Sequence, residues 1–434
     1  MLSDYTSLMK ACWRIFRQTP CRLLWKICRN FAWNNFWWMR RFEKNMKKDQ
    51  PFFPAFNMIS VTETCNLQCS GCWVTAHGRK CLSPGQIDGI IAGSKREGST
   101  FFGILGGEPL MYRGNENDTP SATIRPAAYE NDNGNKVAVV KDNPLFGLME
   151  KHNDCYFQLF TNATLLTDEV AQELRRLGNV TPLISVEGLK EESDRRRGRN
   201  DVFERTLKGI RACRKAGLIF GIAASICQSN LDELMSEDHI KRAVEEGAAY
   251  LWYYIYRPVG AVPNPANALT REQVRRFREF LVEQRRKAPI VIIDTYWDEE
   301  GRAMCPAATG MSHHIGPTGA VEFCPPLQMA REFLNADGSN IVDVYHSSNF
   351  LAQLREMTAD VSRGCILLED PARLAEFLKR HEAVETTSRA TFMKELEAMS
   401  PKAGHDMRDE AIPEKNPLYR WLKKRYFFGF GAYG

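Results

Sequence analysis

Three closely spaced cysteines constrain this chain more than any other feature of its sequence. An apolar stretch, FNMISV at residues 56–61, leads into a loop with the spacing C-x3-C-x2-C. The three cysteines of the loop are Cys65, Cys69 and Cys72. Thiolates are the ligands that iron–sulfur clusters and zinc select, but a structural zinc site normally has four protein ligands. Because His77 and Cys81 follow only after a longer gap, the loop predicts a cluster with one corner open to a non-protein ligand, with zinc as the alternative.

The cysteine content and the start of the chain indicate a reducing compartment. The chain has 13 Cys in 434 residues, and its first residues, MLSDYTSLMK, are too polar for a secretory signal. Cysteines in such a chain are expected to bind metal rather than to form disulfides. No run approaches the ~18 apolar residues that a membrane-spanning helix needs. We therefore expect a cytoplasmic protein, long enough for one large domain or two.

Positive charge is concentrated at the N-terminus. Residues 1–50 hold 11 Lys and Arg against three acidic residues, a net charge of +8, while the remaining chain carries about −3. They also hold five of the nine Trp. Apolar residues recur at helical spacing over 5–16 and 21–48. These helices either pack on the rest of the protein, bind a membrane interface or bind a partner protein. Nucleic acid is not expected, because no recognised binding module accompanies the charge.

From residue 55 onward, apolar strands alternate with amphipathic helices, which is typical of a parallel α/β fold. The expected strands are 56–61, 100–105, 155–160, 180–186, 219–227 and 250–256. The expected helices are 84–96, 144–151, 167–177, 202–216 and 236–246. Six such units predict a partial (βα)6 barrel. In parallel α/β folds the chemistry lies at the C-terminal ends of the strands.

Polar motifs follow several of these strands at that end. The motifs are Gly106-Gly107-Glu108-Pro109 after the second strand, Ser185-Val186-Glu187-Gly188 after the fourth, and Arg257-Pro258-Val259-Gly260 after the sixth. A basic segment, SDRRRG at residues 193–198, comes shortly after the fourth strand. We expect these motifs to converge on the cysteine loop.

The cysteine loop and these strand ends resemble the radical S-adenosylmethionine (radical SAM) enzymes. The resemblance implies that Cys65, Cys69 and Cys72 bind three irons of a 4Fe–4S cluster, whose fourth iron binds the amino and carboxylate groups of SAM. One electron from the cluster then cleaves SAM to methionine and a 5′-deoxyadenosyl radical, which takes a hydrogen atom from the substrate. The chain differs from the family at Gly71, where an aromatic residue often precedes the third Cys; here Trp73 follows that Cys.

The resemblance also assigns the SAM contacts. The Gly-Gly pair is similar to the family's GGEP motif, in which the glycine backbone lets the amino group of SAM approach. Glu187 stands where the family has Asp in an S-x-D-G strand end. Arg197 matches the Arg of a D-x-x-R-G segment and would pair with the SAM carboxylate, while Arg195 and Arg196 are expected in solvent. The predicted SAM-binding residues are Trp73, Gly106, Gly107, Glu108, Ser185, Glu187 and Arg197.

A second group of cysteines lies beyond the expected barrel. Cys305 and Cys324 stand in the spacing C-x13-G-x4-C, and Cys365 follows. This spacing resembles the SPASM/Twitch extension of radical SAM enzymes, which implies an auxiliary 4Fe–4S cluster on these three residues. Its fourth ligand would be another Cys, His313, His314 or the substrate. The alternative is that the three are buried structural thiols, as we expect for the core cysteines Cys155, Cys213 and Cys227.

Three further segments have unusual composition. Residues 112–142 are rich in Asn, Asp, Gly and Pro and form either a flap over the active site or an unstructured insertion. Residues 401–417 are expected to be a linker. The tail, 418–434, is basic and aromatic like the N-terminus.

These patterns predict an α/β protein with four regions. They are a basic aromatic helical extension at 1–54, a radical SAM (βα)6 core at 55–290, a small α+β Twitch-like domain at 291–370, and a helical region with a basic aromatic tail at 371–434.

The predicted function is radical SAM oxidoreductase chemistry on an unidentified substrate, with peptide or protein modification favoured. A flavodoxin or ferredoxin is the expected electron donor. One alternative is a radical SAM enzyme that acts on a lipid or another small molecule at the inner membrane surface, with peripheral contact through residues 1–48. The other is a non-catalytic iron–sulfur or zinc protein that transfers electrons or binds a partner.

Overall fold

A nine-stranded sheet forms the centre of the molecule in the computed structural model. The structure describes residues 2–46, 48, 53–74, 79–114, 128–130, 136–138, 143–260, 263–407 and 410–425. The strand order is β11-β10-β1-β2-β5-β6-β7-β8-β9. Its strands are β1 (Phe56–Ser60), β2 (Phe101–Leu105), β5 (Tyr156–Thr161), β6 (Val180–Ser185), β7 (Gly221–Ile226), β8 (Tyr250–Ile255), β9 (Val291–Ile293), β10 (Ser312–Ile315) and β11 (Val321–Glu322). All neighbouring pairs are parallel except β10 and β11. The predicted α/β class is confirmed.

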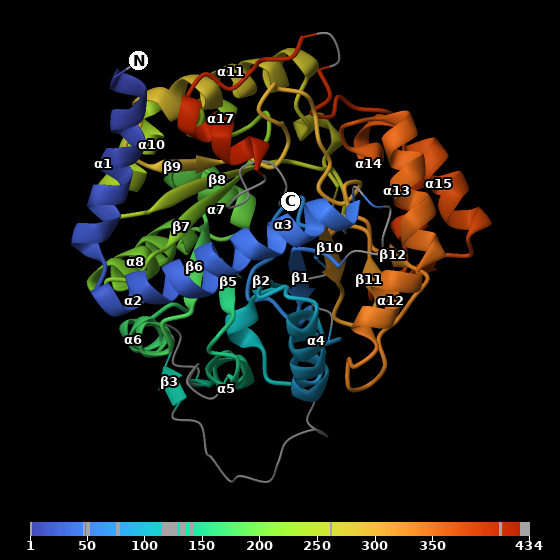
Figure 1. Ribbon diagram of the computed structural model, residues 1–434, viewed down its shortest axis with the longest axis horizontal. Coiled ribbons are helices and arrows are strands. Elements are labelled where there is room, and N and C mark those ends of the chain that lie inside the picture. The colour runs from blue at the N-terminus through green and yellow to red at the C-terminus, as the bar shows by residue number, and fades with distance from the viewer. Residues whose placement is uncertain are drawn as a thin grey trace.

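Helices connect the parallel strands and cover one face of the sheet (Figure 1). They are α4 (Pro84–Arg96), α5 (Pro144–Lys151), α6 (Asp168–Leu177), α7 (Lys190–Arg197), α8 (Val202–Lys215), α9 (Leu231–Leu234), α10 (Glu237–Glu245) and α11 (Arg271–Lys287). Hydroxyl side chains begin several of them: Thr167 accepts a hydrogen bond from Val170 N, and Thr270 forms a capping box with Gln273. These caps satisfy backbone N–H groups that have no partner within the helix.

Alternate residues of each strand face opposite sides of the sheet. Ile59, Ile104 and Leu159 are fully buried against the helix layer. Met58 and Leu105 belong instead to a second apolar cluster on the inner face. Both faces are therefore covered, which explains the nearly continuous apolar strands that the sequence contains.

Strands from the region after residue 290 complete both edges of this sheet. β9 pairs with β8 at one edge, whereas β10 pairs with β1 at the other. The rest of that region holds β12 (Met329–Ala330), α12 (Ile341–Ser347), α13 (Asn349–Val361), α14 (Ile366–Glu369), α15 (Pro371–Arg380), β13 (Val384–Glu385) and α16 (Phe392–Glu397), in orange at the right of Figure 1. The sheet thus crosses the predicted boundary at residue 290, and the division into domains stays a prediction.

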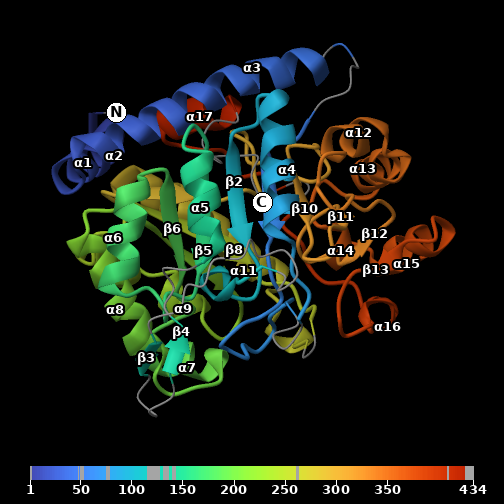
Figure 2. The same cartoon turned by 90° about the horizontal axis from the view of Figure 1, so that it is seen from below.

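The N-terminal helices form a cap under the N-terminal ends of the strands. This N-terminal cap, residues 2–46, consists of α1 (Leu2–Gln18), α2 (Cys21–Lys26), the π-helix η1 (Ile27–Trp33) and α3 (Asn34–Met46). Its side chains donate to carbonyls that lie just before strands: Arg14 to Ala248 at 2.5 Å, and Asn30 to Asn153 at 2.6 Å. Figure 2 shows the cap along one side of the molecule, with α7 and α9 at the opposite end.

The cap buries one of its faces in the open side of the sheet. Trp38, Met39 and Phe42 pack in the inner-face cluster with Phe56 and Tyr156. Packing on the rest of the protein, one of the three predicted roles of this segment, is therefore confirmed for this face.

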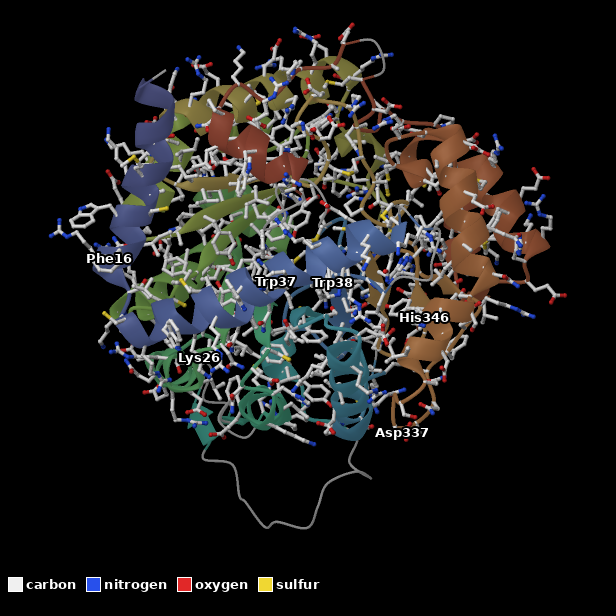
Figure 3. The ribbon with its side chains drawn as sticks, in the orientation of Figure 1. Phe16, Lys26, Trp37, Trp38, Asp337 and His346 are labelled. Carbon is white, nitrogen blue, oxygen red and sulfur yellow. The ribbon has the colours of Figure 1, made fainter. Side chains whose placement is uncertain are left out.

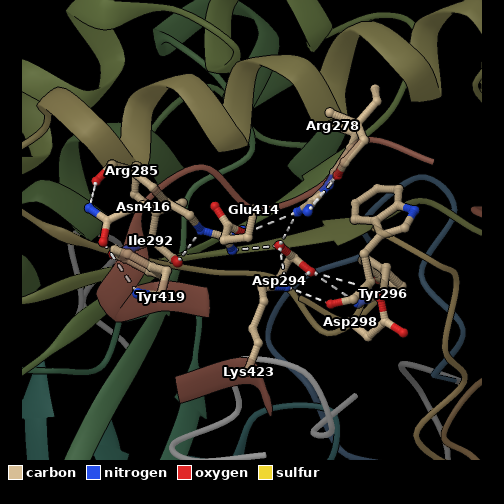
Figure 4. Close-up of polar contacts among 12 residues, drawn as sticks. Arg278, Arg285, Ile292, Asp294, Tyr296, Asp298, Glu414, Asn416, Tyr419 and Lys423 are labelled. Carbon is tan, nitrogen blue, oxygen red and sulfur yellow. Dashed lines mark hydrogen bonds and ion pairs between the residues drawn. The ribbon is translucent and has the colours of Figure 1, made fainter. Parts of the chain in front are cut away.

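The C-terminal segment is anchored by buried ion pairs (Figure 4). Asp294 accepts from Arg285 at 2.5 Å and from Lys423 at 3.1 Å, and Glu414 accepts from Arg285 at 2.8 Å. These side chains are fully buried. The prediction of a linker at 401–417 was wrong for the end of this segment, because Glu414 is a buried counter-ion of Arg278 and Arg285 rather than a solvated group. Helix α17 (Pro417–Lys424) follows and packs on α1.

Short elements complete the described chain. The 3-10 helices η2 (Pro109–Met111) and η5 (Pro265–Asn267) lie in loops, and β3 (Ala128–Glu130) pairs antiparallel with β4 (Lys136–Ala138). Most of the predicted flap lies outside the described residues, as do His77 and residues 426–434 of the tail. The flap remains a prediction.

Candidate active site

A cavity of about 330 Å³ lies at the C-terminal ends of the parallel strands. Both cysteine groups line it: Cys65, Cys69 and Cys72 from the loop after β1, and Cys305, Cys324 and Cys365 from the region after residue 290. The two groups are 233 or more residues apart in the chain. They come together because β9 and β10, from the region after residue 290, pair with the two opposite edge strands of the parallel sheet. The convergence that the sequence predicted for the first group extends to the second.

The loop of Cys65, Cys69 and Cys72 is suited to bind a metal cluster. Burial raises the pKa of the Cys65 and Cys72 thiols to about 12 each. Metal binding would therefore release their protons. No three His, Cys, Asp or Glu side chains in the described part of the chain stand close enough to share one metal ion. Each cysteine of a cubane cluster binds a different iron, so the fit to a cluster rests on the donor set and on the shared cavity.

Gly106 and Gly107 line the cavity and also hold the cysteine loop against β2. A Cβ atom on Gly106, whose φ is +141°, would lie 2.4 Å from the carbonyl oxygen of Thr62. A Cβ atom on Gly107 would lie 2.4 Å from Thr64 O. Only glycine allows this approach. The glycines therefore have a visible structural role beside the predicted contact with SAM.

Glu108 is buried beside the cavity, and its carboxylate is engaged by internal donors. It accepts from Thr161 Oγ1 and Asn162 N, both at 2.8 Å, and from Leu110 N at 3.1 Å. Burial raises the pKa of Glu108 to about 7. These bonds join the ends of β2 and β5. Direct contact of Glu108 with SAM stays a prediction.

Glu187 holds two arginines at the cavity wall. Its carboxylate accepts from Arg196 at 2.6 Å and from Arg197 at 3.4 Å. Arg197 also donates to Cys69 Sγ at 3.6 Å. Burial lowers the pKa of Arg197, but Cys69 and Glu187 outweigh burial and hold that pKa above its ordinary value. The guanidinium of Arg197 thus lies beside the cysteine loop, where a SAM carboxylate is expected, and Ser185 lines the same wall.

Arg196 was predicted to lie in solvent, and this prediction was wrong. Its side chain is buried because it donates to Glu187 and, at 3.0 Å, to Ser225 O at the end of β7. Arg195 is exposed as expected and pairs with Glu192.

Trp73 lines the cavity and is held from behind by His314. Their rings meet edge to face at a centroid distance of 5.6 Å. His314 in turn bonds Ser60 Oγ through Nε2 at 2.7 Å and Glu322 through Nδ1 at 2.5 Å. This chain of contacts ties the indole to β1, β10 and β11.

Cys305, Cys324 and Cys365 share the cavity with Arg257. Burial raises the pKa of Cys305 to about 11 and raises the pKa of Cys324 further. Arg257 at the end of β8 donates to Cys365 Sγ at 3.2 Å. Three thiols with a fixed cation beside them fit an anionic iron–sulfur cluster.

His313 and His314 do not line this cavity, and both nitrogens of each ring have protein partners. His313 contacts Phe323 O at 3.0 Å and Arg355 at 3.4 Å. His313 and His314 are both buried residues of β10. They are therefore not placed to serve as the fourth ligand. Cys155, Cys213 and Cys227 are buried, as expected of core cysteines.

The sequence prediction missed several residues that line the cavity. They are Phe160, Thr161, Asn162, Ser225, Tyr254 and Tyr256, whereas Arg257 belongs to a motif that was expected here. All lie at or just after C-terminal strand ends, so the rule that located the other motifs could also have located these.

Comparison with known proteins agrees with this arrangement. Residues 59–244 match the family described as "Radical SAM superfamily". The chain is 37% identical over 211 residues to an AdoMet-dependent heme synthase of Methanosarcina barkeri, a match that covers 48% of this chain and 52% of that protein. It is 25% identical over 200 residues to the sporulation killing factor maturation protein SkfB of Bacillus subtilis, covering 45% and 41%. The chain thus spans about half the length of the first curated relatives it matches.

Solved structures share the fold. Streptococcus suis SuiB bound to the precursor peptide SuiA has a TM-score of 0.56 at 16% identity, covering 73% of this chain and 70% of that chain. Native anSMEcpe with bound AdoMet and Cp18Cys peptide has a TM-score of 0.51 at 14% identity, covering 86% and 97%. The superfamily's cofactors are a 4Fe–4S cluster and SAM, and the cysteine loop carries the donor set for that cluster. Residues 59–244 thus match the radical SAM superfamily, and the fold is similar to those of SuiB and anSMEcpe.

Proposed function

We propose that this chain cleaves SAM reductively and removes a hydrogen atom from a peptide or protein substrate, with an auxiliary cluster in the same cavity. A cluster on Cys65, Cys69 and Cys72 would supply the electron that converts SAM to methionine and a 5′-deoxyadenosyl radical. The chain's own residues would orient SAM and the substrate and exclude water. The convergence of two cysteine groups on one cavity is the observation that carries this proposal.

Charge at the cavity wall supports the position proposed for SAM. The Arg197 guanidinium beside Cys69 would pair with the SAM carboxylate, and Glu187 would hold that guanidinium in place. On the other side of the cysteine loop, Gly106 and Gly107 have no side chain to cover their backbone, which lines the cavity. Trp73 would cover the site, with His314 fixing its ring.

Cys305, Cys324 and Cys365 would hold the auxiliary cluster. An auxiliary cluster next to the substrate could accept an electron from a substrate radical or ligate the substrate, so an oxidative or redox-neutral modification is favoured. The electron donor we propose is a flavodoxin or ferredoxin.

A peptide substrate is favoured by the relatives. SuiB was solved with its precursor peptide and anSMEcpe with a peptide, and SkfB is named as a maturation protein. A modifying enzyme of this kind must admit an extended chain into its cavity, which here is lined by apolar and aromatic groups that include Phe160, Tyr254 and Phe323.

A tetrapyrrole is the second candidate substrate. The relative at 37% identity is named a heme synthase. An apolar cavity with Arg196 and Arg257 in its wall also has the chemistry to hold a large flat ring with carboxylate side chains. Both arginines already have partners within the protein, which is why this candidate comes second.

Deuterium transfer separates the two candidates. Anaerobically reconstituted full-length protein would be incubated with SAM, reductant and either perdeuterated peptide pools or a deuterated iron porphyrin with propionate side chains. We expect deuterium in 5′-deoxyadenosine only with the peptides. Transfer from the porphyrin alone would replace the peptide proposal with the second candidate. A Cys324→Ala variant should still form 5′-deoxyadenosine but contain about four fewer irons per chain; an unchanged iron content would remove the auxiliary cluster from the proposal.

A further inference from the structure

The outer face of the N-terminal cap exposes an unusual number of large apolar side chains. Ten large hydrophobic side chains are exposed in the described part of the chain, and seven of them belong to the cap. Six of these form what we call the outer aromatic face: Met9, Trp13, Phe16, Trp25, Trp33 and Trp37, each between 51% and 67% exposed. Exposed patches of this kind mark interaction sites. Figure 3 labels Phe16 and Trp37 on the helices of the cap.

The helix geometry separates this face from the buried one. On α1, Leu8 and Ala11 are buried against α17 while Met9, Trp13 and Phe16 point away. On α3, Trp38 is 6% exposed and packs under the sheet, whereas its neighbour Trp37 is 51% exposed. The outer side chains are therefore not needed for the cap to pack on the core. Their rings contact one another: Trp33 and Trp37 at 5.8 Å, and Trp13 and Phe16 at 6.0 Å.

Positive charge surrounds the outer aromatic face. Between residues 5 and 46 the sequence has nine Lys and Arg and one acidic residue, Glu43. Several of the basic residues are exposed. The guanidinium of Arg40 lies 4.7 Å from the centre of the Phe36 ring and 6.0 Å from that of the Trp37 ring. Arginine and lysine that cover apolar rings while their charged groups reach outward are typical of side chains at a membrane interface.

The positive charge around the outer aromatic face also argues against a symmetric dimer formed through this face. In such a dimer the same patch meets itself, so a strongly basic surface would face an equally basic one. Anionic lipid headgroups complement this charge instead, and Trp rings insert at headgroup depth. No helix among the described residues is long and apolar enough to cross a membrane, so such contact would be peripheral.

The cap and the cavity lie at opposite ends of the strands. Cap side chains bind backbone carbonyls just before strands, at Ala248 and Asn153. The cavity instead gathers the residues that follow the strand ends, such as Gly106 and Glu187. Figure 2 shows α3 and the helices α7 and α9 on opposite sides. If the cap bound to a surface, the cavity would face away from that surface.

We propose that the outer aromatic face of the N-terminal cap docks this enzyme on an anionic membrane surface, with the catalytic cavity directed away from the bilayer. The docked face holds the enzyme at the membrane, and the substrate enters from the opposite, aqueous side. This proposal does not depend on the identity of the substrate or on the auxiliary cluster.

Vesicle co-sedimentation of the full-length protein tests it. The probes are vesicles of phosphatidylcholine alone and of phosphatidylcholine with one quarter phosphatidylglycerol. The test variant is Trp25→Gln/Trp33→Gln/Trp37→Gln, and the matched control is Phe333→Ser/Val384→Ser, which changes exposed apolar residues outside the cap. We expect wild type and control to bind the anionic vesicles at least about tenfold more strongly than the neutral ones, and the test variant to lose about tenfold of that binding. A further Arg29→Gln/Lys44→Gln variant should lose about fivefold for each charge removed.

Equal binding of wild type to both kinds of vesicle, or wild-type binding by the triple-tryptophan variant, would overturn the proposal. Wild-type protein that ignores vesicles but self-associates through the same three tryptophans, as measured by analytical ultracentrifugation, would also overturn it in favour of a second copy as the occupant. Iron content and 5′-deoxyadenosine formation are measured on the same preparations. A failure of membrane binding can therefore be distinguished from a failure of the proposed chemistry, because the substituted residues lie outside the cavity.

Discussion

The Nε atom of Arg257 donates a hydrogen bond to the Sγ atom of Cys365 at 3.2 Å. Arg257 lies two residues after β8, the last long strand of the sheet, and Cys365 comes more than one hundred residues later. The guanidinium also bonds Ile255 O at 3.1 Å and lies over the Tyr296 ring at 5.6 Å. Burial lowers the pKa of Arg257, but Cys365 and Tyr296 outweigh burial and hold it above its ordinary value. A permanent positive charge therefore joins the sheet to the proposed auxiliary cluster.

Arg257→Gln should shift the auxiliary cluster to a more negative reduction potential. Loss of a unit charge at ~6 Å, with an effective dielectric constant of ~20, changes the potential by on the order of 100 mV. A redox titration followed by electron paramagnetic resonance measures it. Arg302→Gln, an exposed arginine paired with Asp298, is the control and should leave the potential unchanged. Equal potentials for wild type and Arg257→Gln would show that this arginine does not face the cluster.

Glu187→Gln should weaken SAM binding about tenfold or more, because the carboxylate positions Arg196 and Arg197 and balances their charge. Anaerobic equilibrium binding of SAM to reconstituted protein measures the dissociation constant. Glu191→Gln, at an exposed position of α7, is the matched control. An unaltered dissociation constant in Glu187→Gln would mean that the two arginines keep their places without it.

Because of Glu108, the free energy of unfolding should fall as the pH rises from 4.5 to about 7. Its pKa is raised from 4.5 in the unfolded chain to about 7 in the folded one, so the folded state binds more protons between these values. The stabilisation is complete below pH 4.5 and is lost as pH rises through 7, which amounts to about 3 kcal/mol. Urea unfolding of wild type and Glu108→Gln from pH 5 to pH 8 checks this. The difference between the two proteins should change across that range, and a constant difference would refute it.

Asp294→Asn should unfold the C-terminal anchor. Burial raises the pKa of Asp294, but Arg285, Lys423 and Arg278 outweigh burial and hold it well below its usual range. Removing the carboxylate's charge would leave the buried Lys423 without its counter-ion, at a cost of about 3–5 kcal/mol. Denaturant unfolding and limited proteolysis near residue 410 measure the effect. Glu279→Gln, which removes an exposed partner of Arg275, should change neither; equal losses in both variants would argue against a specific anchor.

Much of the fold and of the site follows from local patterns in the sequence. Apolar strands alternate with capped helices, and polar motifs stand at strand ends, so the α/β class and the convergence of Gly106 and Glu187 on the cysteine loop could be predicted. The same rule applied to the last residues of the sixth strand would have added Tyr254 and Tyr256.

Other features depend on contacts between distant segments. Arg196 looks like a solvated residue in a run of three arginines, yet it is buried because Glu187 and Ser225 O accept its hydrogen bonds. Residues 401–417 have the composition of a linker, but Glu414 is drawn into the core by Arg278 and Arg285 of α11. In each case the deciding partner lies far away in the chain or on another element.

The central claim is that Cys65, Cys69 and Cys72 carry the cluster that cleaves SAM. Iron content and 5′-deoxyadenosine formation of anaerobically reconstituted wild type and Cys65→Ala test it most directly. We predict about eight irons per wild-type chain, with dithionite-dependent 5′-deoxyadenosine, and about four irons with no 5′-deoxyadenosine in Cys65→Ala. Undiminished 5′-deoxyadenosine in Cys65→Ala, or a wild-type protein that binds zinc and leaves SAM intact, would contradict the account.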